Sequence, residues 1–112
     1  MFKLIAFLTR KAGLSQAAFV EHYEQRHAPL IMSLAPPPLR YERRYLERER
    51  PLGGRAPPVD FDAMTELWFE DKDAYRAWMT AIGDPRVAED EARFLDRAKT
   101  RAYAVEAFET DL

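Results

Sequence analysis

The sequence predicts an α+β fold in which two helical regions cover one face of a four-stranded antiparallel sheet. Segments with alternating apolar residues, typical of strands, occur at the start, in the middle and at the end of the chain. Two segments with apolar residues at helical spacing lie between them. The 112 residues fit one domain rather than two.

The N-terminal third is expected to form a central strand followed by a helix. Residues 2–10 are apolar on both alternating sets, as in a strand covered on both faces. Ser15 is a good N-cap, so the helix is expected to start near Gln16. Pro29 lacks a backbone N–H and clashes with the preceding turn, so we expect the helix to kink or end near Ala28.

The rest of the chain is expected to supply three further strands and a second helical region. Alternation predicts strands over residues 39–50, 60–70 and 101–110. The Gly/Pro-rich stretch 51–58 is the loop between the first two of these. Asp71 would cap the next helix, and Pro85 opens another at the tolerated N1 position.

The resulting order, β-α-β-β-α-(α)-β, is the split βαβ arrangement, or ferredoxin-like fold. One sheet face would lie under the helices, and the other would carry Met64 and Trp68 with apolar residues of the first and last strands. Large exposed apolar sheet faces are rare in monomers, so we expect a second copy to cover it, sheet to sheet, in a two-fold homodimer. A ligand cavity would then lie between helices and sheet or between the sheets.

The composition limits the classes of function. Lys and Arg number 17 against 19 Asp and Glu, a net charge of −2, so no nucleic-acid partner is expected. The chain has no cysteine, which excludes disulfides, Cys nucleophiles and Cys-based metal sites and suits a cytoplasmic location. The apolar run before Arg10 is too short for a signal peptide or membrane span. No phosphate loop or dinucleotide fingerprint appears, so no motif implies a cofactor.

Several motifs resemble the EthD family of small dimeric α+β barrel proteins. The most specific is F-x-x-x-Y-x-x-x-H-x-P-L at residues 19–30; T-E-L-W-F-E-D-K-D-A-Y at 65–75 and D-E-A-R-F-L-D at 90–96 support it. The resemblance implies that residues 1–112 form one EthD-like domain, a ferredoxin-like protomer whose sheet pairs into a dimeric barrel. The family accompanies an oxidative ether-degrading system, and related barrels include polyketide cyclases, isomerases, dehydratases and cofactor-free monooxygenases.

His27 is the first candidate catalytic residue. It follows Tyr23 by four residues, so the two side chains share the inward face of the helix. A partly buried imidazole there could act as a general acid or base on a ligand. The alternative is structural: the ring hydrogen-bonds backbone groups freed by Pro29, or supports the kink.

Glu66 is the second candidate catalytic residue. It shares a strand face with Met64 and Trp68, and covering that face would raise the pKa of the carboxyl group by desolvation. The alternative is an ion pair with an arginine of the neighbouring strand, Arg43 or Arg44.

The two histidines are not predicted to form a metal site. His22 and His27 are five residues apart, which is about 140° around an α-helix at ~100° per residue. Two metal ligands on one helix need to be three or four residues apart to converge. His22 is therefore expected at the flank of the helix.

Aromatic side chains supply most of the candidate ligand-binding residues. The set is His22, Tyr23, Tyr41, Trp68 and Tyr103. Phenol groups could bind a carbonyl of the ligand and an indole could form a pocket wall, although such residues on sheets are more often packing groups.

Two functions are consistent with these residues. In the first, a dimer without a cofactor binds a small apolar, aromatic or polyketide-like molecule, and His27 with Glu66 or a tyrosine moves a proton in an isomerisation, cyclisation, dehydration or oxygenase-type step. In the second, the dimer is a non-catalytic ligand-binding or accessory protein of an oxidative pathway, and His27 is purely structural.

Overall fold

The computed structural model describes residues 1–55 and 57–112 and confirms the ferredoxin-like protomer. Residue 56, in the predicted 51–58 loop, lies outside the described part. The strands are β1 (Phe2–Leu8), β2 (Arg40–Tyr45), β3 (Ala63–Phe69) and β4 (Arg101–Ala104). The helical segments are α1 (Gln16–His22), η1 (Tyr23–His27), α2 (Ala28–Leu34), α3 (Lys72–Ile82), α4 (Pro85–Phe94) and η2 (Arg97–Lys99).

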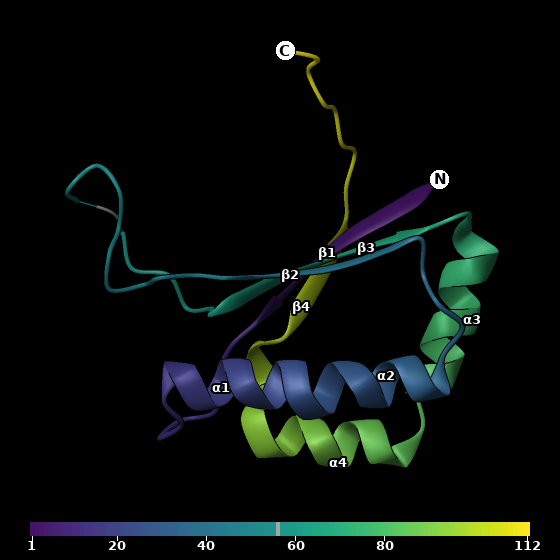
Figure 1. Cartoon of the computed structure of the whole chain (residues 1–112), viewed down its shortest axis with the longest axis horizontal. Helices are drawn as coiled ribbons and strands as arrows, with labels where there is room; N and C mark the ends of the chain where they lie inside the picture. The colour runs from purple at the N-terminus through teal and green to yellow at the C-terminus, as the bar shows by residue number, and fades with distance from the viewer. Residues whose placement is uncertain (56) are drawn as a thin grey trace.

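The four strands form an antiparallel sheet in the order β2-β3-β1-β4. The helices α1, α2, α3 and α4 all lie on one side of this sheet (Figure 1). Alternation along β3 separates its two faces. The face toward the helices carries the buried residues Ala63, Thr65, Leu67 and Phe69, and the face away from them carries Met64, Glu66 and Trp68. We call the latter the open face.

Two clusters of buried side chains fill the space between sheet and helices. One surrounds Trp78 of α3, which contacts the ring of Phe69. The other contains Phe19 of α1 and Phe94 of α4, both with no exposed surface. Burying one such side chain contributes about 1.5–3 kcal/mol, so these rings hold the helical layer on the sheet. None of the described helices has the length and apolar character needed to cross a membrane.

The first helix begins as expected but does not end near Ala28. The Ser15 hydroxyl accepts a hydrogen bond from the Ala18 amide at 3.1 Å, so it caps α1. The helical backbone then continues through Pro29 as α2, by way of the π-helical turn η1. In this turn the Ala28 amide bonds the Tyr23 carbonyl, five residues back. The wider turn moves the preceding carbonyls, so the proline ring fits without breaking the helix.

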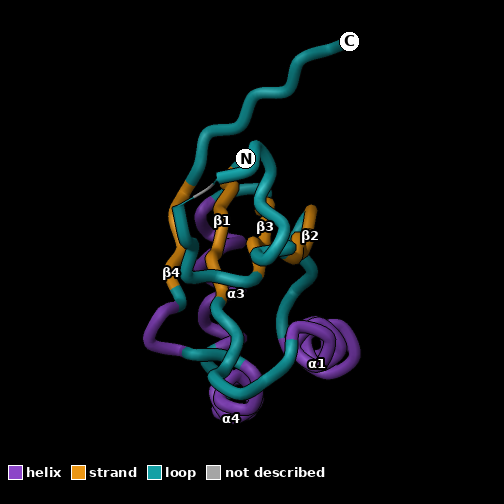
Figure 2. The backbone as a smooth tube through the Cα atoms, turned by 90° about the vertical axis from the view of Figure 1, so that its left-hand side faces the viewer, coloured by secondary structure: helices purple, strands orange, loops and turns teal. Residues whose placement is uncertain are grey.

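The last strand is shorter than the predicted 101–110. Ala104 lies opposite Leu4 in the sheet, and the Val105 amide still bonds the Lys3 carbonyl at 3.0 Å. Beyond that point β1 has almost no residues left to pair with, because it begins at Phe2. The chain therefore leaves the sheet, and its C-terminal segment extends away from the side that α1 and α4 occupy (Figures 1 and 2).

A buried carboxylate closes the base of the β2–β3 hairpin. Asp62 has no exposed surface and accepts hydrogen bonds from the Arg10 amide at 2.8 Å and from Arg48 Nη1 at 3.1 Å. Its own amide bonds the Leu8 carbonyl at 2.8 Å, and its carbonyl accepts from the Leu46 amide at 2.9 Å. Asp62 therefore ties both ends of the hairpin loop to the end of β1.

Replacing Phe94 with alanine tests the packing of α4 on the first helix. Phe94 contacts the rings of Phe19 and His27, so Phe94→Ala should lower the free energy of unfolding by about 3–5 kcal/mol. Urea unfolding measures this. Leu52→Ala, at a residue 94% exposed, should stay within about 0.5 kcal/mol of the parent. A loss at Phe94 no larger than at Leu52 would contradict the described packing.

Candidate functional site

A carboxylate on α4 binds both histidines of the first helical region. Asp90 is 4% exposed, and its Oδ2 lies 2.9 Å from His27 Nδ1. Its Oδ1 lies 3.0 Å from His22 Nε2 and 3.4 Å from Arg93 Nη1. One carboxylate therefore links α1, the π-helical turn and α4.

The π-helical turn explains why the histidines converge. On an α-helix the five-residue spacing would point them apart, as the sequence analysis predicted. In η1 the hydrogen bonds run to the fifth residue back, so residues five apart come onto the same face. The expectation that His22 sits apart on the flank is therefore wrong. Its ring stacks on Phe94 with centroids 4.6 Å apart, and it shares Asp90 with His27.

The charges of this group are set by burial and hydrogen bonding together. Burial disfavours the ionised form of Asp90, but the hydrogen bonds from His27 and His22 outweigh it and hold the pKa of Asp90 below its usual value. Burial lowers the pKa of His27 by more than Asp90 raises it. At neutral pH the pair is therefore a carboxylate and a neutral imidazole.

This charge state fixes the tautomer of His27. The ionised Asp90 only accepts, so the proton of the neutral ring lies on Nδ1 and the lone pair on Nε2. Nε2 makes no hydrogen bond with a described residue. His27 as a whole is 5% exposed. An Nε2 atom that carries a lone pair and has no hydrogen-bond partner among the described residues has the form of a general base.

Three hydroxyl groups form a chain between helix and sheet beside His27. The Tyr23 hydroxyl lies 2.8 Å from Thr65 Oγ1, and the Tyr41 hydroxyl donates to Tyr23 at 3.3 Å. The Tyr23 and His27 rings meet edge to face with centroids 5.5 Å apart. Burial raises the pKa of Tyr23 and of Tyr41, so both phenols stay protonated and can donate hydrogen bonds.

A positive charge lies next to this hydroxyl chain. Arg43 forms a two-pronged ion pair with Glu24, with both N···O distances at 2.7 Å, and its guanidinium sits 4.7 Å from the centre of the Tyr41 ring. The Arg43 hydrogen bond holds the pKa of Glu24 below its usual value, and Tyr45 also donates to this carboxylate. The helix-facing side of β2 is thus polar and charged where it meets η1.

Glu66 does not join this group. It lies on the open face of β3, whereas His27 lies on the helical side of the sheet. Arg44 Nη1 binds its Oε2 at 2.8 Å and Trp68 Nε1 donates to Oε1 at 2.6 Å. The Arg44 hydrogen bond lowers the pKa of Glu66, which is opposite to the rise expected from desolvation. The structure therefore shows the alternative given in the sequence analysis, an ion pair between Glu66 and an arginine of the neighbouring strand.

The other candidate ligand-binding residues divide between the two faces. Tyr23 and Tyr41 come together on the helical side, as described above. Trp68 lies on the open face, where Lys3 Nζ sits 3.9 Å from the centre of its ring. Tyr103 of β4 is 57% exposed, and its ring centroid lies 6.2 Å from that of Phe7 on the same face. One protomer therefore does not gather all five into one pocket.

A broad, open hollow of about 910 Å³ lies beside the hairpin loop. Its lining includes Arg10, Tyr45, Arg48 and Leu52, but neither His27 nor Glu66.

Across residues 1–55 and 57–112, no group of three or more His, Cys, Asp or Glu side chains is arranged to hold a metal ion.

Sequence reasoning missed three polar residues of the site, Glu24, Thr65 and Asp90. It considered Arg43 only as a partner of Glu66, whereas the structure pairs Arg43 with Glu24. Both Asp90 and Glu91 fit the helical spacing between Val87 and Phe94, and the sequence analysis did not single out Asp90 as the inward one. The usable signal was a carboxylate inside an apolar stripe, in a chain with two histidines close together.

Fold and site together define a small ferredoxin-like α+β protein with a buried carboxylate–histidine pair under its helical layer. More specifically, the chain belongs to the EthD family, because the EthD domain model matches residues 11–98, most of its length. No match was found among curated proteins.

Solved structures support the same fold. An EthD family protein from Bacillus halodurans superposes with a TM-score of 0.67 at 21% identity, over 96% of this chain and all of the other. SnoaB, a cofactor-independent oxygenase from Streptomyces nogalater, gives 0.59 at 15% identity, over 97% and 94%. A dimeric ferredoxin-like protein from Thermobifida fusca gives 0.58 at 15% identity, over 95% and 90%.

Stability should fall as the pH is lowered from neutral, partly through His27. The pKa of His27 is lower in the folded chain than its ordinary value of about 6.5. As the pH is lowered, this histidine is therefore protonated first in the unfolded chain, and the free energy of unfolding falls below about pH 6.5. Asp90 acts in the same direction at lower pH, because its folded pKa is also lowered. Urea midpoints at pH 7.5 and 5.5 measure the effect.

The variant His27→Asn isolates the contribution of His27 to this pH dependence. The free energy of unfolding of this variant should fall less between pH 7.5 and 5.5 than that of the parent. Gln25→Ala, at an exposed position in the same turn, should show the same fall as the parent. An unchanged pH slope in His27→Asn would show that His27 is not buried in its neutral form.

Proposed function

We propose that the protein is a cofactor-free enzyme of small-molecule metabolism in which His27 removes a proton from a carbon next to a carbonyl group. The substrate is a small apolar, aromatic or polyketide-like molecule. The observation that carries this proposal is the buried pair of His27 and Asp90, which leaves His27 Nε2 without a hydrogen bond to any described residue. EthD family membership supports a role in small-molecule metabolism.

In this proposal Asp90 positions the base. Its carboxylate accepts the Nδ1 proton, fixes the ring orientation, and stabilises the imidazolium that forms when Nε2 takes the substrate proton. The lowered pKa of His27 keeps the imidazole free of a proton at neutral pH. A positioned base of this kind typically contributes a factor of about 10²–10⁴ in rate.

The hydroxyl chain is proposed to stabilise the negative charge that develops on the carbonyl oxygen of the substrate. When the C–H bond breaks, its electron pair moves onto the carbonyl oxygen of the substrate. The Tyr23 phenol lies beside His27 and can turn its proton to the substrate, because Thr65 can act as the donor between those two hydroxyl groups. Tyr41 supports it by donating to Tyr23, and the Arg43 guanidinium, paired with Glu24, lies next to the Tyr41 ring. Donors aimed at a developing oxyanion lower its energy in the transition state, and one such donor is often worth 10²–10³ in rate.

All four reaction types considered from the sequence begin with this proton removal. Return of the proton to another carbon gives isomerisation, attack of the carbanion on a second carbonyl gives cyclisation, and loss of a hydroxyl group as water gives dehydration. Reaction of the carbanion with molecular oxygen gives an oxygenase-type step. The similarity to SnoaB, described as a cofactor-independent oxygenase, supports including the last of these.

One observation favours a second candidate function, a non-catalytic ligand-binding or accessory protein. His27 is only 5% exposed and packs against the rings of Tyr23 and Phe94. A histidine in that position also serves to join η1 to α4 through Asp90. In this alternative the carboxylate–histidine pair holds the helices together, and the ligand is bound without reacting.

We further propose that the working form is a homodimer joined through the open face. Ile5, Phe7 and Met64 are half-buried there, and the exposed Tyr103 lies beside them. These side chains form an apolar patch beside the paired charges of Arg44 and Glu66, and large exposed apolar patches mark association surfaces. The similarity to a dimeric ferredoxin-like protein supports a second copy as the cover.

His27→Asn tests the catalytic role while keeping the hydrogen bond to Asp90. The amide nitrogen of asparagine can replace Nδ1, but nothing replaces the base Nε2. Deuterium uptake at the carbon next to the carbonyl, in acetophenone and hydroxylated aromatic ketones in heavy water, measures proton removal by NMR. We expect the parent to accelerate exchange and His27→Asn to lose a factor of at least about 10².

Melting temperature separates the two candidate functions. A catalytic His27 predicts lost exchange with a melting temperature near that of the parent. Exchange that persists in His27→Asn, or a large drop in melting temperature with no exchange activity in the parent, would favour the accessory protein. Gln25→Ala serves as the matched control in the same turn.

Ile5→Asp tests the homodimer. Ile5 pairs with Tyr103 and Glu66 across the centre of the open face, so a charge there should prevent two sheets from packing. Light scattering should give twice the chain mass of 13.0 kDa for the parent and a single chain mass for the variant. Met79→Asp, at an exposed position of α3, should remain dimeric. A parent that is monomeric at all concentrations would overturn the proposal.

A further inference from the structure

We propose that the hollow beside the β2–β3 hairpin loop is a binding site for a small carboxylic acid with an apolar body, and that Arg10 and Arg48 bind its carboxylate. The inference goes beyond the proposed function, because neither His27 nor Asp90 lines the hollow. The hairpin loop lies on the opposite side of the molecule from α3 (Figure 1). The volume of about 910 Å³ is within the range of about 300–1,000 Å³ typical of small-molecule sites.

Two arginines converge on one buried carboxylate at the wall of the hollow. Arg10 Nε lies 3.4 Å and Arg48 Nη1 lies 3.1 Å from the same atom, Asp62 Oδ1. The other carboxylate oxygen, Oδ2, accepts a hydrogen bond from the Arg10 amide at 2.8 Å. The two guanidinium groups carry two positive charges against the single negative charge of Asp62. One positive charge is left over, and an anion with one negative charge in the hollow would balance it.

Both guanidinium groups are held in place and still have N–H groups to offer to a ligand. Arg10 Nη1 donates to the Leu14 carbonyl at 3.2 Å, and Arg48 Nη2 donates to the Val59 carbonyl. A guanidinium has five N–H groups, so these contacts leave several on each arginine. The side chains of Arg10 and Arg48 are 33% and 34% exposed. Arginines fixed in this way lose little freedom on binding, and their forked geometry matches a carboxylate.

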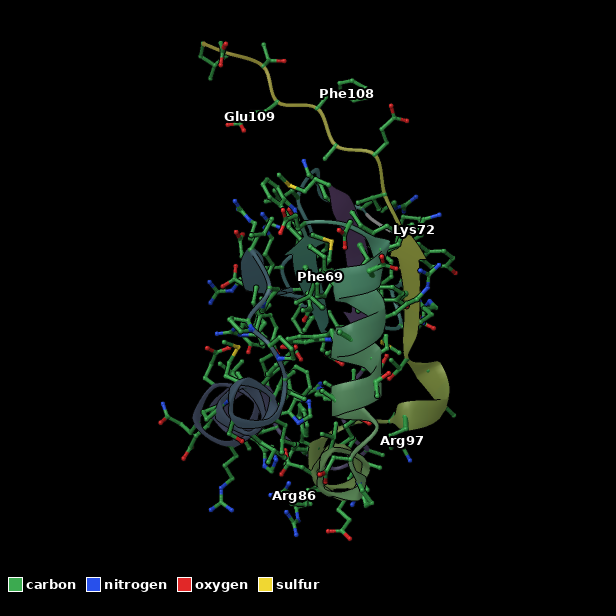
Figure 3. All side chains as sticks on the ribbon, turned by 90° about the vertical axis from the view of Figure 1, so that its right-hand side faces the viewer. Phe69, Lys72, Arg86, Arg97, Phe108 and Glu109 are labelled. Atoms are coloured by element: carbon green, nitrogen blue, oxygen red, sulfur yellow. The ribbon has the colours of Figure 1, made fainter. Side chains whose placement is uncertain are left out.

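The position of the two arginines also favours access by a ligand. Besides the large hollow, Arg10 and Arg48 both line two smaller hollows, of about 270 and 530 Å³. The C-terminal segment, which carries Phe108 and Glu109, extends away from the body of the protein (Figure 3), and none of its residues lines the large hollow. The arginine pair therefore lies where several hollows meet, and the C-terminal segment leaves it open.

Much of the remaining wall is apolar, which indicates the rest of the ligand. It consists of Tyr45, Leu46, Leu52, Val59 and three prolines. Leu52 is 94% exposed and Val59 is 39% exposed. An apolar group that enters the hollow would remove part of this surface from water, which stabilises the complex by about 25 cal/mol for each Å² buried. The wall therefore fits an acid with a hydrocarbon or aromatic body better than a bare anion.

Two carboxylates also line the hollow, but they do not neutralise the arginine pair. Glu47 and Glu49 are exposed, and neither forms an ion pair with a described residue. Because both side chains are in contact with solvent, water and salt screen their charges. Their presence favours a ligand with a single negative charge over a doubly charged phosphate group.

Titration of the ¹⁵N-labelled protein with phenylbutyrate, followed by NMR, tests the site. We expect saturable shifts of the amide signals of Arg10 and of residues 45–50. Phenylbutyramide has the same apolar body without the charge and should bind at least about tenfold more weakly. Acetate has the charge without the apolar body and should also bind at least about tenfold more weakly. If either binds as tightly as phenylbutyrate, the proposed class of ligand is wrong.

Substitution of Arg48 separates the arginine pair from the general charge of the loop. Arg48→Gln should weaken phenylbutyrate binding at least about tenfold. Arg50→Gln removes a positive charge from the same hollow but no contact with Asp62, and should change the affinity by less than about threefold. If Arg48→Gln does not fold, Arg48→Lys keeps a charge beside Asp62, and without the fork it should bind at least about threefold more weakly.

The outcomes of these measurements are distinct. Unchanged affinity in the Arg48 variant that folds, or an equal loss in Arg50→Gln, would overturn the inference. Binding in the hollow should leave the amide signals of residues 22–28 in place, and shifts confined to those residues would place the acid at His27 instead. Failure of the deuterium-exchange test would remove the proposed function without affecting this site.

Discussion

The Asp90 carboxylate is the interaction on which the arrangement of the helical layer depends. It is buried and ionised, and it accepts hydrogen bonds from His22 and His27. Both histidines reach it only because the turn between them is π-helical. Pro29, two residues after the turn, disfavours a regular α-helical turn before it, and a regular turn would point the two histidines apart. A proline, a wide turn and a buried charge therefore form one structural unit.

The two sides of the sheet carry groups of different chemistry. The helical side holds a neutral imidazole, protonated phenols and an arginine close together. The open face holds carboxylates that are paired with arginines and remain ionised. Groups suited to proton transfer and groups suited to surface pairing are thus separated by the thickness of one sheet. This division underlies our proposal that reaction takes place on one face and association on the other.

Much of the fold was predictable because it depends on local patterns. Alternation identified every strand, and Ser15, Asp71 and Asp84 cap their helices through side-chain oxygens. Strand ends were less predictable: β4 stops at Ala104 because β1 runs out of partners, which no local pattern encodes.

The site was predictable only in part, for a related reason. His27 and Tyr23 were singled out because they share a helical face, and the structure places them together. The pairing with Asp90 depends on a π-helical turn, and an α-helical wheel cannot anticipate a change of helical period. Glu66 was placed on the correct strand face, but the strength of its pairing with Arg44 depends on the register between β2 and β3.

The buried Asp62 has a consequence for how this chain can diverge. The carboxylate and backbone of Asp62 bind both ends of the β2–β3 hairpin loop to the end of β1. Of the described loop residues, 49–55, 57 and 58 take no part in these hydrogen bonds to Asp62 and β1. Insertions, deletions and new side chains there leave the sheet unchanged, and several of those residues line the open hollow. The loop can therefore change in length and chemistry without disturbing the carboxylate–histidine pair, which lies on other elements of the fold.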